Sequence, residues 1–332
     1  MASRDARRTR ILLSDVQFRV HRGLEPGIVE AAGALMRATW PPPSLDYSPE
    51  LLQWQLTFPG DVQPLAVTGW IGERCVAFAG ATPRSVCTDG WEGRVLLKSF
   101  MTVAADLKGQ GIGRRLRTLI VREAGASGDP ILRFGEASQA SGRALVEDYT
   151  NAGMHVRMLG ACSAAATVAK GGAPAPPLSA SEFALLWSQH PRVGVINPLP
   201  QEGESAHYAR DPRQRVVLGV RDADDRLVAG AMVVRAAIAG RRGVEPSVQF
   251  EQLAVTSEAE GSDVARLASD AAHWGYAAGS GVVTIPNIGD TPWPLLAAAG
   301  FRKLAPRYSV WGASRDPSHP ILEATATNIE IV

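Results

Sequence analysis

The sequence has few residues of the kinds that form cross-links or bind metal ions. Its three cysteines, Cys75, Cys87 and Cys162, lie far apart and form no Cys-x-x-Cys pair. An odd number of separated cysteines argues against a disulfide framework or a zinc ribbon and favours a reducing compartment. The six histidines include no His-Glu-x-x-His or similar pair, so the sequence predicts no metal site.

The chain also lacks an excess of charge and a long hydrophobic run. Lys and Arg number 34 against 33 Asp and Glu, a net charge of +1. This balance provides no overall field for a nucleic acid or an anionic membrane. Only the short run Ile11–Leu13 follows the N-terminal arginines, and the longest weakly apolar stretch, 159–169, is about half of a membrane span. We therefore expect a cytoplasmic protein without nucleic-acid or membrane partners.

What the sequence does contain is the composition of a globular protein of 332 residues, with 45% hydrophobic and 20% charged residues, long enough for two domains. A Pro- and Gly-rich segment, 170–179, is typical of a linker. On both sides of it a hairpin, an apolar strand, a helix and a further strand recur at an offset of about 150 residues. The sequence predicts domains at 1–168 and 181–313, a linker at 169–180 and a poorly ordered tail at 314–332. Two unrelated α/β domains are the alternative.

One segment of the first half carries a chemical signal. The short apolar strand Ser99–Val103 is followed by Lys108-Gly-Gln-Gly-Ile-Gly113, which opens into an Arg-rich amphipathic helix, Ile112–Glu123. Glycine-rich backbone at a helix N-terminus binds anions, because successive amides point one way and the helix dipole adds positive charge. The spacing fits neither a GxxxxGK[ST] loop nor a dinucleotide fingerprint at the start of a domain. An ordinary tight turn is the alternative.

The strand, the loop and the helix closely resemble the acyl-CoA motif of the GCN5-related N-acetyltransferase (GNAT) superfamily, usually written [Q/R]xxGx[G/A]. The helix ending at Tyr149-Thr-Asn-Ala-Gly-Met154 resembles the family's Tyr-x-x-x-Gly-Phe ending, and the resemblance covers about residues 16–168. The layout is similar to tandem acetyltransferases such as mycothiol synthase, in which only one half is catalytic. It implies an α/β fold of two tandem GNAT-like domains, each a mostly antiparallel twisted sheet flanked by helices.

The resemblance further implies an N-acyltransferase. Acetyl-CoA or a longer acyl-CoA would be the co-substrate, no metal would be needed, and an amine would attack the acyl group directly. Tyr149 would protonate the departing thiolate, although a buried core tyrosine is the alternative. Donor binding would fall to Met101, Thr102, Val103, Lys108, Gly109, Gln110, Gly111, Ile112, Gly113, Arg114 and Arg115.

Two departures from the family pattern stand out. Lys108 occupies a position where Gln or Arg is usual, which is a mild change because the loop acts mainly through main-chain amides. More important, Lys98, Ser99 and Phe100 supply no carboxylate on the strand where many members carry a general base. Glu136 on the next strand is the nearest acidic candidate, with Asp148 and His155 behind it. Proton loss to water, with Glu136 merely solvated or ion-paired, is equally compatible with the sequence.

The acceptor is expected to meet the segment before the first hairpin. This segment contains Trp40, Asp46, Tyr47 and Trp54, and aromatic rings beside a carboxylate suit a cationic or apolar acceptor. The same residues also suit an ordinary core. The resemblance leaves the acceptor open as an amine-bearing small molecule or a peptide.

The second half has lost the glycine loop. The matching segment, Val255–Asp263, has Glu258 and Glu260 where phosphates would lie and only Gly261 of the glycines. Acidic side chains there would repel a pyrophosphate. Near the position of Tyr149 the second half has Trp293, which is no acid. We therefore expect a second copy that retains the fold, has lost donor binding and forms one wall of the acceptor cleft.

Two other functions are compatible with the same residues. An acyl carrier protein could be the donor, with Arg114, Arg115 and Arg117 meeting its acidic surface. Alternatively, the protein could bind acyl-CoA as a sensor or scaffold without turnover, because the strand carboxylate is missing.

Overall fold

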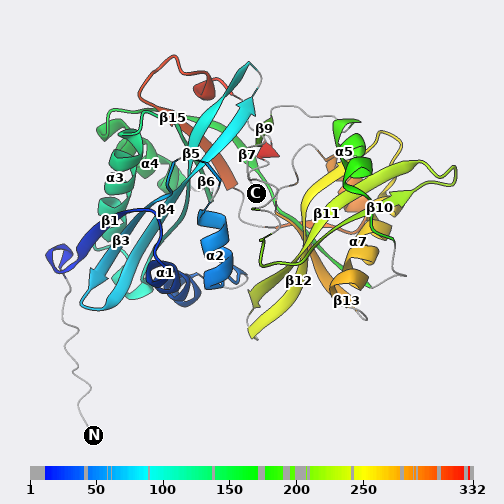
Figure 1. Ribbon diagram of the computed structural model, residues 1–332, viewed down its shortest axis with the longest axis horizontal. Coiled ribbons are helices and arrows are strands. Elements are labelled where there is room, and N and C mark those ends of the chain that lie inside the picture. The colour runs from blue at the N-terminus through cyan, green and yellow to red at the C-terminus, as the bar shows by residue number, and fades with distance from the viewer. Residues whose placement is uncertain are drawn as a thin grey trace, which may run out of the picture.

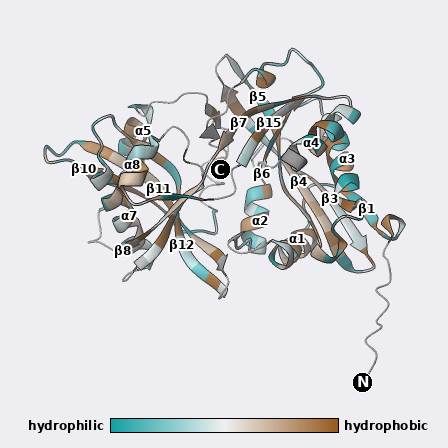
Figure 2. Ribbon diagram, turned by 180° about the vertical axis from the view of Figure 1, so that it is seen from behind, coloured by the Kyte–Doolittle hydropathy of each residue, from teal (hydrophilic) through white to brown (hydrophobic). Residues whose placement is uncertain are grey.

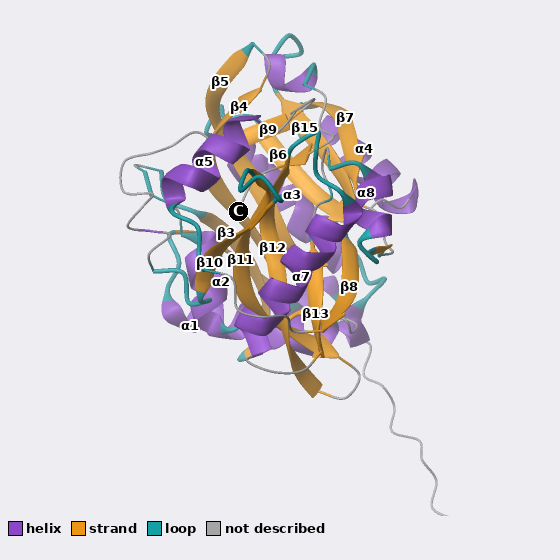
Figure 3. Ribbon diagram, turned by 90° about the vertical axis from the view of Figure 1, so that its right-hand side faces the viewer, coloured by secondary structure: helices purple, strands orange, loops and turns teal. Residues whose placement is uncertain are grey.

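The computed structural model has two lobes, each built on one twisted sheet (Figure 1). It describes residues 12–40, 44–57, 59–60, 62–88, 90–136, 139–170, 176–189, 195–198, 207, 210–240, 243–276, 280–286, 288, 291–304, 308–324 and 328–329. In both lobes the strands form the interior and most helices lie outside them (Figure 3). Apolar residues concentrate along the strands, whereas α3 (Ile112–Gly125) also carries hydrophilic residues (Figure 2).

The first sheet has nine strands. Across the sheet their order is β1 (Gln17–Arg22), β3 (Leu65–Ile71), β4 (Arg74–Thr88), β5 (Trp91–Val103), β6 (Ile131–Glu136), β15 (Tyr308–Ser314) and β7 (His155–Cys162), with β9 (Val195–Pro198) paired to β4 and β16 (Asn328–Ile329) to β9. Apart from the parallel pairs β5–β6 and β9–β16, the pairings are antiparallel.

The second sheet has seven strands and repeats this pattern. Its order is β10 (Arg215–Arg221), β11 (Leu227–Gly240), β12 (Gly243–Val255), β13 (Ser280–Ile285), β8 (Ala165–Lys170) and β14 (Arg302–Lys303), with β2 (Ser44–Leu45) paired to β11. Its parallel pair is β12–β13, in the place that β5–β6 holds in the first sheet. The predicted α/β fold class, with two mostly antiparallel sheets flanked by helices, is confirmed.

Helices cover both faces of the first sheet. They are α1 (Pro26–Thr39), α2 (Pro49–Leu56), α3 and α4 (Gln139–Asn151); the second half has α5 (Ala180–Gln189), α7 (Gly261–Tyr276) and α8 (Trp293–Ala298), and short 3-10 turns η1 (Leu13–Asp15), η2 (Ala105–Leu107) and η3 (Pro320–Leu322) join them. Helix α3 buries residues at helical spacing, among them Ile112, Leu116 and Ile120. Helix α2 starts at Pro49, and the Ser48 hydroxyl caps it by accepting from the Leu51 amide.

The two halves exchange strands. Strand β8 of the first half lies between β13 and β14 in the second sheet, and β15, near the C-terminus, lies between β6 and β7 in the first. Figure 1 shows β15 in red among the cyan and green strands of the first lobe. Most strands of each sheet come from one of the predicted ranges 1–168 and 181–313, but β8 and β15 and the short strands β2, β9 and β16 cross that division.

The stretch 314–332, expected to be a poorly ordered tail, is packed where the structure describes it. The turn η3 buries Ile321 completely and Leu322 almost completely against the first sheet. Strand β15 lies in the first sheet and precedes η3, so the apolar turn packs onto that same sheet. The sequence pattern alone did not reveal this placement.

Candidate functional site

The parallel strands β5 and β6 separate part-way along their length. They pair at Leu96–Ile131, Leu97–Leu132 and Lys98–Arg133; beyond that point β5 continues along β4 and β6 along β15. We call the last pair, Lys98 and Arg133, the fork. The edge of Ser99–Val103 that faces β6 has no strand partner among the described residues. An opening with unpaired backbone groups can hydrogen-bond an extended amide-bearing ligand.

A bulge bends β5 just beyond the fork. The register of β4 against β5 shifts between Phe78 and Gly80, and Phe100 has a φ of 57°. A bulky residue in this region is strained by about 1–3 kcal/mol, and such strain concentrates at functional sites. The bulge directs Phe100 towards the α1 and α2 face, where its ring meets Tyr47, and Met101 towards α3.

The predicted glycine loop forms the N-terminus of α3. Gly109 and Gly111 both have a φ of 82°, which glycine adopts without strain, and Gly111 is the N-cap residue. No side chain among the described residues caps the helix. The first helical bond runs from the Arg115 amide to the Gly111 carbonyl, so the amides of Ile112–Arg114 have no carbonyl of the helix to reach. These donors and the helix dipole form an anion site.

The loop and the opened strand adjoin each other. A Cβ placed on Gly113 would lie 3.6 Å from Val103 Cγ2 and 3.7 Å from Met101 Cε. Gly113 therefore lies against the two β5 residues that the sequence assigned to the donor. Thr102, on the same strand, is buried, and its hydroxyl has no hydrogen-bond partner among the described residues. The structure thus joins the anion site to the opening between β5 and β6.

The basic residues around the loop have different roles. Arg114 pairs with Glu147 at 2.8 Å and with Asp148 at 3.8 Å, and Arg117 pairs with Asp148, so two of the arginines hold α3 against α4. Lys108 and Arg115 are exposed and make no ion pair among the described residues. Gln110 is exposed as well, whereas the Ile112 side chain is core. Lys108 and Arg115 therefore offer positive charge to phosphate groups bound at the neighbouring helix amides.

Tyr149 lies in the last turn of α4, beneath the sheet near the fork. The helix ends because Gly153 takes a φ of 74° and the Met154 amide bonds back to the Tyr149 carbonyl, at 3.0 Å. The tyrosine is almost completely buried, and its hydroxyl has no partner among the described residues. Burial raises its pKa well above that of an ordinary phenol. An orphaned buried hydroxyl is costly, which is typical of a group that awaits a ligand.

Lys98 and Arg133 at the fork were not identified as functional residues from the sequence. Lys98 is 2% exposed, and neither its Nζ nor the Nη1 of Arg133 has a hydrogen-bond partner among the described residues. The Lys98 Nζ lies 5.5 Å from the centre of the Tyr149 ring. Burial, with help from Arg133 and Arg117, lowers the pKa of Lys98 to about 7. A lysine within an apolar strand was the available signal, but sequence alone does not reveal burial.

Aromatic residues gather on the opposite face of the sheet. The Tyr47 ring meets Trp40 edge-on at 5.4 Å and Phe100 at 5.2 Å, and Phe134 of β6 stacks on Tyr308 of β15 at 5.0 Å. Burial and the neighbouring Tyr308 raise the pKa of Tyr47 to about 12, against an opposing effect of Arg213. Residues from both halves therefore face the α1 and α2 side of the opening.

Two further residues of the predicted acceptor site have distinct surroundings. One carboxylate oxygen of Asp46 is buried without a partner among the described residues, while the Asp46 amide donates to Ala237 of the second sheet at 2.7 Å. Trp54 packs in the contact between the halves: its Nε1 donates to the His207 carbonyl at 2.9 Å and Arg213 lies 5.1 Å above the ring.

The surroundings of the three candidate residues, Glu136, Asp148 and His155, do not identify a general base. The backbone of Glu136 lies opposite Tyr308 at the end of β6, and its side chain is outside the described residues. Asp148 is engaged by Arg117 and Arg114, and His155 is exposed at the start of β7. The assignment of the base to Glu136 stays a prediction.

The matching region of the second half is built differently. Strands β12 and β13 separate after Gln249–Thr284, in the place of the fork, but α7 starts at Gly261, where an added Cβ would come 2.4 Å from Ala298 of α8. The Asp263 carboxylate accepts from the Glu260 amide at 2.9 Å, which places a carboxylate at this helix end. The glycine after α8, Gly300, matches Gly153, which places Leu296 and not Trp293 at the position of Tyr149.

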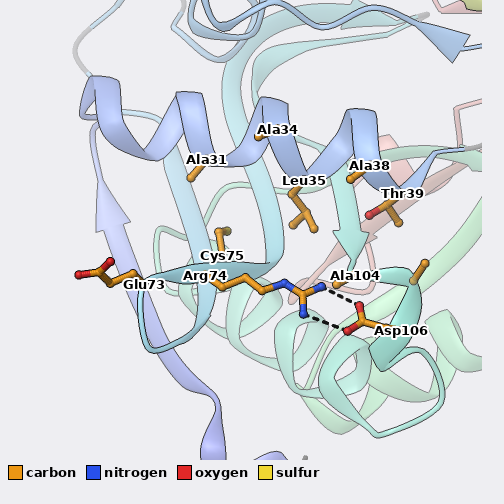
Figure 4. Close-up of a pocket in the computed structure, with 11 residues that line it drawn as sticks. Ala31, Ala34, Leu35, Ala38, Thr39, Glu73, Arg74, Cys75, Ala104 and Asp106 are labelled. Atoms are coloured by element: carbon orange, nitrogen blue, oxygen red, sulfur yellow. Dashed lines mark hydrogen bonds and ion pairs between the residues drawn. The ribbon is translucent and has the colours of Figure 1, made fainter. Parts of the chain in front are cut away.

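A separate cavity of about 490 Å³ lies between α1 and the turn that joins β3 to β4 (Figure 4). Small residues of α1 line one side, and Arg74 and Asp106 form a two-bond ion pair across the other, at 2.9 and 2.7 Å. None of the predicted site residues lines it. Within the described ranges, no helix is long and apolar enough to span a bilayer, and no cluster of three or more His, Cys, Asp and Glu could hold a metal ion.

No family model and no curated protein sequence matches the chain. Solved structures do resemble it. Saccharomyces cerevisiae N-myristoyltransferase with bound myristoyl-CoA superposes with a TM-score of 0.64 at 11% identity, over 92% of this chain and 84% of that one. A tandem GNAT protein from the clavulanic acid biosynthesis pathway gives 0.57 at 16% identity, over 91% and 99%. The chain thus has the tandem-domain GNAT fold that the sequence predicted.

Proposed function

We propose that this protein is an N-acyltransferase whose first half binds an acyl-CoA and transfers the acyl group to an amine by direct attack. The observation that carries the proposal is the junction of two features: the uncapped α3 N-terminus adjoins the strand edge opened beyond the fork. The first suits a pyrophosphate and the second suits an extended amide chain, and both occur in one molecule of coenzyme A.

The residues present fit such a donor. The amides of Ile112–Arg114 would hold the pyrophosphate, with Lys108 and Arg115 beside it. The free edge of β5 at Met101–Val103 would bond the pantetheine amides and an amide there would face the acyl carbonyl. The donor supplies a thioester, in which a carbonyl carbon is joined to a good leaving group. An amide aimed at the carbonyl oxygen stabilises the negative charge that forms when an amine attacks.

The protein's own groups would then manage charge and protons. Tyr149 would donate a hydrogen bond at the sulfur from its orphaned hydroxyl. On the other face, Tyr47 and Trp40 would position the acceptor, and the unpaired oxygen of Asp46 would accept from an ammonium group. The second half would form the far wall of the acceptor site through Arg213, whose charge acts to lower the pKa of the Tyr47 hydroxyl.

The acceptor is proposed as an amine of a small molecule or a peptide, and the donor as free acyl-CoA. One structural neighbour holds myristoyl-CoA, so the donor series to be tested should run from acetyl to long acyl chains. No comparison supports an acyl carrier protein as the partner.

The test is a calorimetric titration of the purified protein with acetyl-CoA and longer acyl-CoAs, beside Gly113→Asp and the neutral control Gly113→Asn. Both side chains have the same room, because the nearest atoms to a Cβ at Gly113 lie at ordinary contact distance. We expect one site per chain, kept in Gly113→Asn and weakened at least ~100-fold in Gly113→Asp, because a carboxylate would face the pyrophosphate.

Three outcomes decide the proposal. A single site with the expected charge dependence supports it, and a screen of amines with the preferred donor then identifies the acceptor. Absence of binding to every acyl-CoA contradicts it. Binding without acylation of any amine would favour a sensor or scaffold instead.

A further inference from the structure

The fork places the buried Lys98 beside the half-buried Arg133. Lys98 and Arg133 are neighbours in the parallel ladder and point to the same face, beneath which α3 and α4 pack. The Arg133 guanidinium lies along β6 beyond the fork, because a Cβ on Gly135 would be 3.2 Å from its Nη2. Both cations therefore face the region where the strands have separated.

Among the described residues, the charges around Lys98 do not balance. The groups that face it are Arg133 from β6, Arg117 from α3, and Asp148 and Tyr149 from α4; on β4 its partner is the uncharged Ala81. Asp148 is the one carboxylate among these described groups, and it is already paired with Arg117 and Arg114. A buried unpaired cation is costly, so such a cluster favours either a neutral Lys98 or an anionic ligand.

We infer that Lys98 is the group that delivers a proton to the departing sulfur. This rests on the proposed acyl transfer, in which the thioester C–S bond breaks as the C–N bond forms. The sulfur leaves as a thiolate, the one anion that the reaction creates near Tyr149. A proton passes from the Lys98 ammonium to this sulfur and leaves a neutral amine, which regains a proton when the acceptor nitrogen releases one through water.

The acidity of the neighbouring groups agrees with this assignment. Proton transfer is favourable only from an acid at least as strong as the one formed, and a thiol has a pKa of about 8.5. Burial raises the pKa of the Tyr149 phenol further above that of a thiol, so Tyr149 alone is a poor proton source. Burial and the two arginines lower the pKa of Lys98 to about 7, which makes its ammonium a stronger acid than the thiol. Tyr149 then serves as a positioning hydrogen-bond donor.

The first experiment needs no acceptor, because its probe is coenzyme A itself. The thiol of bound coenzyme A is titrated by its thiolate absorbance in wild-type protein, Lys98→Met, Lys98→Arg and Lys303→Met. Lys303 is the matched control, since it is an exposed lysine 4.6 Å from the Trp293 ring in the second half. We expect Lys98→Arg to bind a more acidic thiol than Lys98→Met, by about one pKa unit, because a guanidinium keeps its charge while the thiol titrates. The wild type and Lys303→Met should match Lys98→Met in thiol acidity, because the Lys98 ammonium is the stronger acid and loses its proton first.

The second experiment separates proton delivery from charge alone. With the acceptor identified, kcat should fall about 100-fold in Lys98→Met at an unchanged donor Kd. Lys98→Arg should stay equally slow at neutral pH, since a guanidinium keeps its proton, and Lys303→Met should match the wild type.

The failures of the two proposals are distinguishable. Equal thiol acidity in Lys98→Arg and Lys98→Met, or an unchanged kcat in Lys98→Met, with coenzyme A bound, would overturn the role of Lys98 and leave the proposed function standing. A full recovery of kcat in Lys98→Arg would also overturn proton delivery. Absence of coenzyme A binding in the wild type would overturn the proposed function itself. A melting curve for each variant shows whether it is folded.

Discussion

The two halves of the chain share a backbone plan and differ in what fills its centre. Each sheet has a central parallel pair that separates after three residues, at Lys98–Arg133 in the first half and at Gln249–Thr284 in the second. The first opening has buried cations and an uncapped helix end. The second has neutral groups at the fork and a helix end closed by Asp263 and Ala298. The same fold thus carries a candidate site in one half and packing in the other.

The bulges beyond the two forks show the same contrast between a candidate site in the first half and packing in the second. In the first half the bulge residue Phe100 meets Tyr47 in the candidate acceptor region. The corresponding bulge residue in the second half is Glu251, which forms ion pairs of 2.5 Å with Arg213 and 2.8 Å with Arg215. Because Arg213 also covers Trp54 of α2, the second bulge fastens the halves together.

The largest effect is expected when the first half is made to resemble the second at the end of α4. Tyr149→Leu copies Leu296, and kcat should fall about 10²–10³-fold, because the hydrogen bond that stabilises the charge on the departing sulfur is lost. Donor affinity should change little, because the pyrophosphate site is separate. Steady-state kinetics with the identified acceptor and a donor titration check this; Tyr149→Phe controls for the loss of ring volume. Wild-type kcat in Tyr149→Phe would contradict the role given to the hydroxyl.

Removing the ion pairs of Glu251 in the second half should lower the free energy of unfolding without changing the donor site. Glu251→Gln removes the carboxylate that pairs with both Arg213 and Arg215, which should cost about 3 kcal/mol of unfolding free energy. The control Asp106→Asn breaks an exposed pair with Arg74 and should cost less than about 1 kcal/mol. Urea unfolding measures both. Equal costs would show that the network does not fasten the halves.

A smaller effect concerns the pH dependence contributed by Lys98. Its pKa is about 7 when folded and about 10.5 when unfolded, so between these values only the unfolded chain retains the proton. Unfolding free energy should therefore rise with pH over this window by up to ~1.4 kcal/mol per unit, and no further above it. Lys98→Met removes the rise and should be the more stable protein near neutral pH. Thermal unfolding from pH 6.5 to 10 in both proteins checks this; parallel curves would contradict a buried, unpaired amine.

The smallest effect contrasts two helix-start glycines. Gly261→Ala forces a Cβ to within 2.4 Å of Ala298 and should destabilise the fold by about 1–3 kcal/mol. Gly113→Ala meets only ordinary contacts and should be neutral or stabilising by up to ~1 kcal/mol. Chemical denaturation of the pair measures the difference, and a reversed order would mean that the second helix end is open.

The sequence was most informative where local backbone chemistry determines structure. Gly109 and Gly111 form the predicted loop at the start of α3, both with a positive φ, and Gly153 ends α4 four residues after Tyr149. The repeat predicted the recurring series of hairpin, strand, helix and further strand. These features depend on glycine conformation and hydrophobic period, which a single sequence displays.

What the sequence could not predict depends on tertiary packing. Nothing in the strands β8 and β15 indicates that each joins the sheet of the other half. In the sequence, Lys98 resembles an ordinary surface lysine, but in the fold β6, α3 and α4 enclose it. Trp54 was expected to bind the acceptor, yet its partners His207 and Arg213 lie more than 150 residues away in the chain. Long-range neighbours of this kind are set by topology rather than by local pattern.

The central claim is that only the first half binds the donor, and both halves can be compared in one measurement. Amide hydrogen exchange is followed by mass spectrometry with and without acyl-CoA. Protection should appear in the peptide that covers 108–116 and leave the matching peptide around 256–264 unchanged, because carboxylates at the second helix end would repel a pyrophosphate. Protection at the second helix end, or at neither, would contradict the account.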